Sequence, residues 1–192
     1  AYDKIFYMFD TLRKFTIRLL RGYRSRRQEL FFGFGADCES DMIEAVIGRK
    51  PTIVSEAILP GYQLCIQSLE DIPVSGANPR EILQRSWGND FVSYTIRQNK
   101  EEQVKGTLFS MSQRERMMLD IWEMVPEGWQ DSVVVRVKLP NGKFVRARTQ
   151  RLPRGHNHGY STSGLNYKPW LMPKADFLRI ASQDAFSYGE LI

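Results

Sequence analysis

Asp120 and Glu123 lie three residues apart in the segment LDIWEMV, residues 119–125, near the end of an expected helix. Carboxylates three residues apart are neighbours on a helix surface, and a positioned carboxylate can take a proton from a substrate. A glutamate at a helix end is, however, most often a solvated surface residue. Two interpretations of Glu123 follow: a general base in an active site, or a carboxylate without a catalytic role.

Other residues with chemical potential have weaker contexts. His156 and His158, in GHNHG, have the spacing of two metal ligands, but neither a Cys nor a third His accompanies them. We expect them to lie in a solvent-exposed loop, and we expect neither a metal nor a cofactor. Trp87, Trp122 and Trp129 are scattered through connections and helix ends, so we expect them to anchor the core.

The elements that must position these residues follow from hydrophobic periodicity. Strand patterns recur along the chain, and they cover residues 30–35, 51–67, 91–98, 104–112 and 131–150. The second of these contains Pro60-Gly61 and is interpreted as two strands joined by a turn. Helical patterns cover residues 40–50, 112–125 and 173–189, and a short helix begins at Pro79.

Capping residues and turns locate several boundaries. Ser40 is the expected N-cap of the first helix, and Ser112 with Glu115 forms a capping box at the start of the second. Asn141-Gly142 is typical of a tight turn between two strands, so residues 131–150 are the clearest hairpin in the chain. These elements predict an α+β fold with a mixed or antiparallel sheet, curled into a small barrel flanked by helices.

Charge is distributed unevenly along the chain of 192 residues. Residues 1–30 hold eight Lys and Arg against three Asp and Glu, a surplus of five positive charges. This surplus equals the net charge of the whole chain, which is +5. The rest of the chain is close to neutral, which argues against a nucleic-acid-binding domain. Its longest apolar runs fall short of the roughly 20 residues that a membrane span needs.

Residues 4–24 are predicted to form a basic amphipathic helix. Apolar residues such as Phe9, Leu12 and Phe15 follow the helical period, while Arg and Lys fall mostly on the other side. Three partners for the apolar face remain open: the chain's own domain, a membrane surface, or another protein subunit. We therefore divide the chain into a helical extension, residues 1–29, and a domain, residues 30–192.

Particular segments resemble the gamma-glutamylcyclotransferase-like family. LFFGFGAD, residues 30–37, resembles that family's strand and YGSN loop. Residues 42–66 resemble its next helix and its A-x-L-x-G-Y strand, and residues 104–125 resemble its V-x-G-x-L-Y strand and LD-x-x-E helix end. Residues 167–189 look like its closing helix. The resemblance covers residues 30–192 and implies a small barrel, flanked by helices, with a cavity at one end.

The resemblance also implies a chemistry. The family's enzymes cyclise a γ-glutamyl group to 5-oxoproline, which requires a base for the substrate's ammonium and backbone N–H groups for its anionic part. Glu123 falls on the catalytic glutamate, and Phe34, Gly35, Ala36 and Asp37 fall on the substrate loop. Only Gly35 keeps the family's residue type in that loop. A carboxylate at Asp37 would repel an anionic substrate.

Two functions are therefore expected. The first is a non-catalytic accessory subunit, docked into a larger assembly by residues 4–24. The second is an active cyclotransferase with Glu123 as base. The chain begins with Ala rather than Met, which would suit removal of an organellar presequence. Together with the basic amphipathic character of residues 4–24, this leads us to expect a mitochondrial membrane complex, with the cytoplasm as the alternative.

Overall fold

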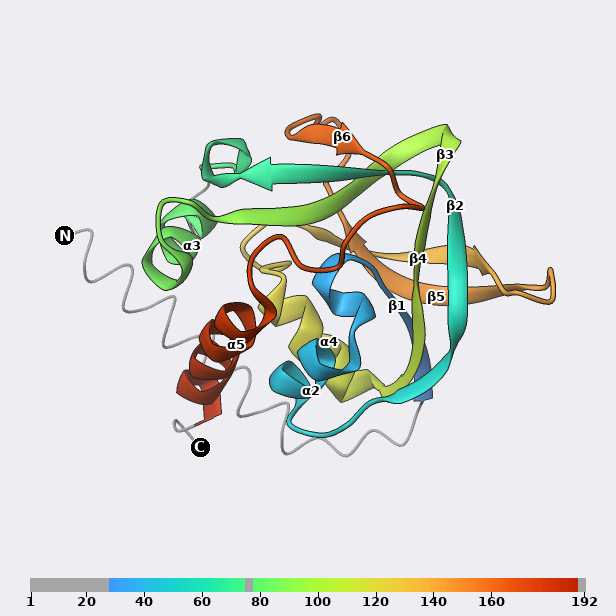
Figure 1. The fold of residues 1–192 in the computed structure, drawn as a ribbon, viewed down its shortest axis with the longest axis horizontal. Coiled ribbons are helices and arrows are strands. Elements are labelled where there is room, and N and C mark those ends of the chain that lie inside the picture. The colour runs from blue at the N-terminus through green and yellow to red at the C-terminus, as the bar shows by residue number, and fades with distance from the viewer. Residues whose placement is uncertain (1–27, 75–77, 190–192) are drawn as a thin grey trace.

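The computed structural model describes residues 28–74 and 78–189, and strands in these residues close into a mixed barrel (Figure 1). The strands are β1 (Gln28–Gly33), β2 (Thr52–Ser68), β3 (Val92–Ser112), β4 (Asp131–Lys138) and β5 (Phe144–Arg151). They pair in the order β3-β1-β5-β4-β2, and β2 pairs with β3 to complete the ring. The β1–β5 pairing is parallel and the others are antiparallel. The expected small barrel with a mixed sheet is confirmed.

The alternation of side chains along β1 divides the core into two parts. Phe32 points into the barrel, where it packs with Leu59, Ile96 and Leu108. Its neighbour Phe31 faces outward and packs beneath helices. Both phenylalanines are fully buried. An apolar run without polar alternation is therefore required of β1, because the barrel covers one of its faces and the helices cover the other.

Helices α2 (Ser40–Ile47), α4 (Gln113–Trp122) and α5 (Lys174–Gly189) gather on one side of the barrel (Figure 1). Their buried side chains share one cluster with Phe31, and these side chains include Met42, Ile43, Leu119 and Ala181. α3 (Pro79–Trp87) begins after Asn78, whose side chain accepts a hydrogen bond from the Glu81 N–H. The short 3-10 turns η1 (Gly35–Cys38) and η2 (Leu69–Asp71) follow β1 and β2 respectively.

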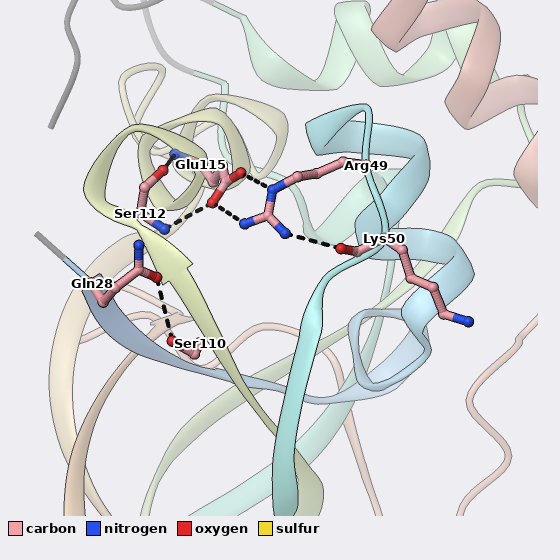
Figure 2. A network of polar contacts seen from close by, with 6 residues as sticks. All are labelled: Gln28, Arg49, Lys50, Ser110, Ser112 and Glu115. Carbon is pink, nitrogen blue, oxygen red and sulfur yellow. Dashed lines mark hydrogen bonds and ion pairs between the residues drawn. The ribbon is translucent and has the colours of Figure 1, made fainter. Parts of the chain in front are cut away.

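The start of α4 is fixed by a polar network (Figure 2). Ser112 and Glu115 form the expected capping box, in which Glu115 Oε2 accepts from the Ser112 N–H at 2.8 Å. Arg49 also reaches Glu115, donating from Nη2 at 2.7 Å, and its Nη1 donates to the Lys50 carbonyl at 2.9 Å. Glu115 thus joins the first turn of α4 to the chain that follows α2 (Figure 2).

Three sequence-based boundaries were wrong. Residues 51–67 form one strand, because the chain bends at Pro60-Gly61 with a register shift and keeps pairing with β3 on both sides. Residues 91–98 and 104–112 likewise belong to the single strand β3. Ser40 lies inside α2, since Glu39 takes the extended N-cap conformation. A short strand was also missed: Tyr160–Thr162, just after His156 and His158, form β6, which pairs with β2.

Two further expectations were an N-terminal helix and the lack of a membrane-spanning segment. The predicted helix over residues 4–24 lies outside the described residues, so the division at residue 29 stays a prediction; β1 begins at Gln28. Among the described residues, no helix is long and apolar enough to cross a membrane.

Candidate functional site

Glu123 stands at the point where α4 stops. It is the C-cap residue of the helix, and the following Met124 takes the left-handed conformation with φ of 50°, which turns the chain away. Glu123 Oε2 accepts a hydrogen bond from Gln130 Nε2 at 3.3 Å. Gln130 is itself held by Thr95, whose hydroxyl donates to Gln130 Oε1 at 3.2 Å. The Glu123 carboxyl is therefore oriented by a chain of buried polar groups.

The loop of residues 34–37 folds tightly against the barrel. Gly35 has φ of +59°, and a Cβ on it would lie 2.9 Å from the Cβ of Tyr94. Only glycine adopts this positive φ without strain and leaves room for the Tyr94 side chain. Gly35 is also the one residue of the loop that matches the YGSN motif. The Asp37 N–H donates to the Phe34 carbonyl at 3.1 Å, and this turn places Asp37 on the same cavity as Glu123.

A segment near the C-terminal end of the chain lies over this loop. The Gly35 N–H donates to the Tyr167 hydroxyl at 3.3 Å, and that hydroxyl donates to the Lys105 carbonyl at 2.6 Å. The Tyr94 hydroxyl donates to the Lys168 carbonyl at 2.9 Å, and the Tyr94 and Tyr167 rings pack edge to face. One backbone donor of the glycine loop is thus already used inside the protein.

The cavity has a volume of about 70 Å³. Its polar lining includes Asp37, Glu123 and Gln150, which come from η1, the end of α4 and β5. Most of the remaining lining is apolar and aromatic, and its rings include those of Phe34, Trp87, Phe91, Tyr94, Trp122, Trp129 and Phe177. The expected cavity at the end of a barrel is therefore present, and it contains Glu123 and three residues of the expected substrate loop, Phe34, Ala36 and Asp37.

Comparison with known proteins identifies the fold family. No family model and no curated protein matches the sequence. A solved structure named gamma-glutamyl cyclotransferase superposes with a TM-score of 0.55 at 18% identity, covering 70% of each chain. A crystal structure of an uncharacterised human protein superposes with a TM-score of 0.56 at 16% identity, covering 85% of this chain and 86% of that one. The chain has the gamma-glutamylcyclotransferase-like fold.

In this gamma-glutamylcyclotransferase-like domain the pKa of both cavity carboxyls is raised. Burial raises the pKa of Asp37 from 3.8 to about 7. Burial also raises the pKa of Glu123 well above its usual range, and the nearby charges of Asp37 and Asp120 raise it further. Part of the Glu123 surface still opens on the cavity, but its carboxyl is surrounded mainly by protein atoms. Near neutral pH the pair therefore retains protons that ordinary carboxyls would have lost.

Asp120, three residues before Glu123, does not line the cavity. It forms an ion pair with Arg116, and its Oδ1 accepts from Gln150 Nε2 at 2.9 Å. Arg116 also donates to Glu29 Oε2 on β1 at 3.0 Å. Asp120 thus has a structural role: it helps to hold α4 on the barrel and orients Gln150 at the cavity.

Several site residues were not found from the sequence. Trp87, Trp122 and Trp129, expected to anchor the core, also line the cavity. Tyr167 and Gln130 were missed because their partners Gly35 and Thr95 are distant in sequence and no local pattern connects them. His156 and His158 pack edge to face outside this site, and the described residues contain no group of three or more potential metal ligands.

Proposed function

We propose that the protein is a non-catalytic accessory subunit that uses a gamma-glutamylcyclotransferase-like domain as a scaffold. The observation that carries this proposal is the state of the glycine loop. Its Gly35 N–H is bonded to Tyr167, and its Asp37 carboxyl faces the same cavity as Glu123. A γ-glutamyl substrate brings its own carboxylate, which would lie near Asp37, a carboxyl that is partly ionised near neutral pH, and would find this backbone donor occupied.

The proposal includes docking into a larger assembly through residues 4–24, with a mitochondrial membrane complex as the assembly. A basic amphipathic segment beside a nearly neutral domain supports it, because such a segment can bind an apolar partner surface and anionic lipid together.

The docking proposal predicts a large native mass. In a mild detergent extract of the source cells, we expect the protein to migrate with a complex far larger than its own 22.3 kDa. The double change Leu12→Gln and Phe15→Gln should release it, because both residues belong to the predicted apolar face. Thr11→Gln, which lies outside the predicted apolar face, is the control and should leave association unchanged. A free monomer in the wild-type extract would contradict the proposal.

An active cyclotransferase is the second candidate, and the placement of Glu123 favours it. The carboxyl lies in the cavity and is oriented by Gln130, and burial raises its pKa, which makes its ionised form a stronger base. The ionised carboxylate would take one proton from the substrate's ammonium, after which the free amine attacks the γ-carbonyl. The bond between that carbonyl and the departing amine then breaks, and the two protons lost by the attacking nitrogen go to the amine that leaves.

Measurement of 5-oxoproline separates the two candidates. We expect the purified protein to release none from γ-glutamyl amines or peptides above the rate without protein, and Glu123→Gln to change nothing. Release that Glu123→Gln abolishes, while the exposed control Glu101→Gln retains it, would establish the enzyme and remove the first proposal.

A further inference from the structure

Three hydrogen-bond acceptors converge on the cavity. Within the described residues no hydrogen bond reaches the Asp37 carboxyl, and Glu123 accepts only the bond from Gln130. Gln150 is 2% exposed. Its Nε2 donates to Asp120, which leaves its Oε1 as an acceptor without a partner in the described part of the chain. These three residues line the cavity, so a ligand that donates hydrogen bonds could satisfy their free acceptors.

The cavity lining provides no positive charge. None of the described residues that line it is Lys or Arg. The nearest acidic neighbour, Asp120, has its own partner in Arg116, so that arginine is engaged away from the cavity. The charge on Asp37 and Glu123 is therefore left for protons or for a bound cation to balance.

The aromatic walls favour a cation as well. Trp87 lies at the centre of a group of rings, with centroids 6.1 Å from Trp122 and 4.7 Å from Phe177. Phe91 and Trp129 form a further edge-to-face pair at 6.0 Å. The Trp129 indole N–H donates to Gln67 at 3.1 Å, so it does not compete for the acceptors of the cavity. Aromatic faces attract cations and also pack against hydrocarbon.

We propose that this cavity binds a small primary alkylammonium ion. The three N–H groups of the ammonium would donate to Asp37, Glu123 and Gln150, and the alkyl chain would lie against the rings of Trp87 and Phe91. The volume of about 70 Å³ limits the ligand to a short chain. This site goes beyond the proposed accessory role, because it belongs to the barrel domain and requires no assembly.

An amino acid or a γ-glutamyl compound is a poorer ligand for the same reasons. Its carboxylate would need donors, whereas the site offers acceptors and the Gly35 N–H is held by Tyr167. Losing such contacts while adding like-charge repulsion opposes binding. The site therefore discriminates between ligands by charge: it selects a monocation over an anion or a zwitterion of similar size.

Binding should strengthen as the pH rises through about 7, where Asp37 loses its proton. The other titratable groups around the pair do not reverse this trend. The pKa of Cys38 is raised to about 12, those of Tyr94 and Tyr167 are also raised, and Asp120 is paired with Arg116. An alkylammonium keeps its charge to about pH 10, so the ligand stays cationic over this range.

Calorimetric titration of the purified full chain with n-propylammonium tests the proposal. At about pH 8 we expect saturable binding in the millimolar range, and at about pH 6 binding about tenfold weaker, because the pair then holds an additional proton. Propionate should not bind, and tetramethylammonium, which has no N–H donor, should bind at least about tenfold more weakly.

Two variants distinguish binding at this cavity from a general effect of removing a negative charge. Asp37→Asn should weaken n-propylammonium at least about tenfold at pH 8, while Asp90→Asn, which removes an exposed carboxylate, should leave it unchanged. Circular dichroism would confirm that both variants are folded. Absence of saturable binding, binding of propionate equal to that of n-propylammonium, or equal affinities in wild type and Asp37→Asn would each overturn the proposal.

Discussion

Asp37→Asn is expected to raise the free energy of unfolding by roughly 2–4 kcal/mol at about pH 8 and to change it little at about pH 4. The reason is the cost of ionising a carboxyl that the surrounding protein desolvates, although the residue as a whole is half-buried. Burial raises its pKa from 3.8 to about 7 in the folded protein. An asparagine amide has nearly the same shape and no charge to bury.

The sign follows from proton binding. In the unfolded chain Asp37 ionises near 3.8, whereas in the folded protein it keeps its proton to about 7. Between these values the folded state binds more protons, so the wild-type protein loses stability as the pH rises through this window. Below the window both states are protonated, and the variant has no advantage there.

Urea unfolding of wild type and variant at both pH values measures this effect. Asp90→Asn provides the control, because this exposed carboxylate has no buried environment to escape. A gain of the same size at both pH values would show that the Asp37 carboxyl ionises normally in the folded protein. A loss of stability at pH 8 would show that its charge is compensated by a partner.

The parts of the fold that the sequence predicted are those with local determinants. The hairpin of β4 and β5 is specified by alternation and by Asn141-Gly142, and α4 is specified by Ser112 and Glu115. The long strands β2 and β3 were divided wrongly. Pro60-Gly61 has the composition of a turn, yet pairing of β2 with β3 carries the chain through it as an irregularity in the strand.

The site, too, could be predicted only where local sequence segments determine it. Glu123 and the residue 34–37 loop belong to recognisable segments, and the barrel brings them to one cavity. The hydrogen bond from Gly35 to Tyr167 joins residues separated by 132 positions. Tyr167 decides whether a backbone donor of the loop is available, but no local periodicity relates the two residues.

Arg116→Met is expected to lower the free energy of unfolding by roughly 3 kcal/mol at pH 7. Arg116 is 8% exposed and pairs with two carboxylates, Glu29 on β1 and Asp120 on its own helix. Methionine has the length to fill the space but leaves both carboxylates without their cation. Urea unfolding measures the loss, and Arg114→Met on the same helix is the control, since no ion pair of Arg114 lies within the described residues.

A triple variant identifies the cause of that loss. Adding Glu29→Gln and Asp120→Asn to Arg116→Met removes the two unpaired charges, and we expect it to recover at least about half of the lost stability. If Arg116→Met alone costs less than about 1 kcal/mol, the ion pairs do not hold α4 on β1. If the triple variant recovers nothing, the loss comes from packing of the arginine stem. Recovery would show that the two carboxylates at β1 and α4, next to the helix end that carries Glu123, are costly without their cation.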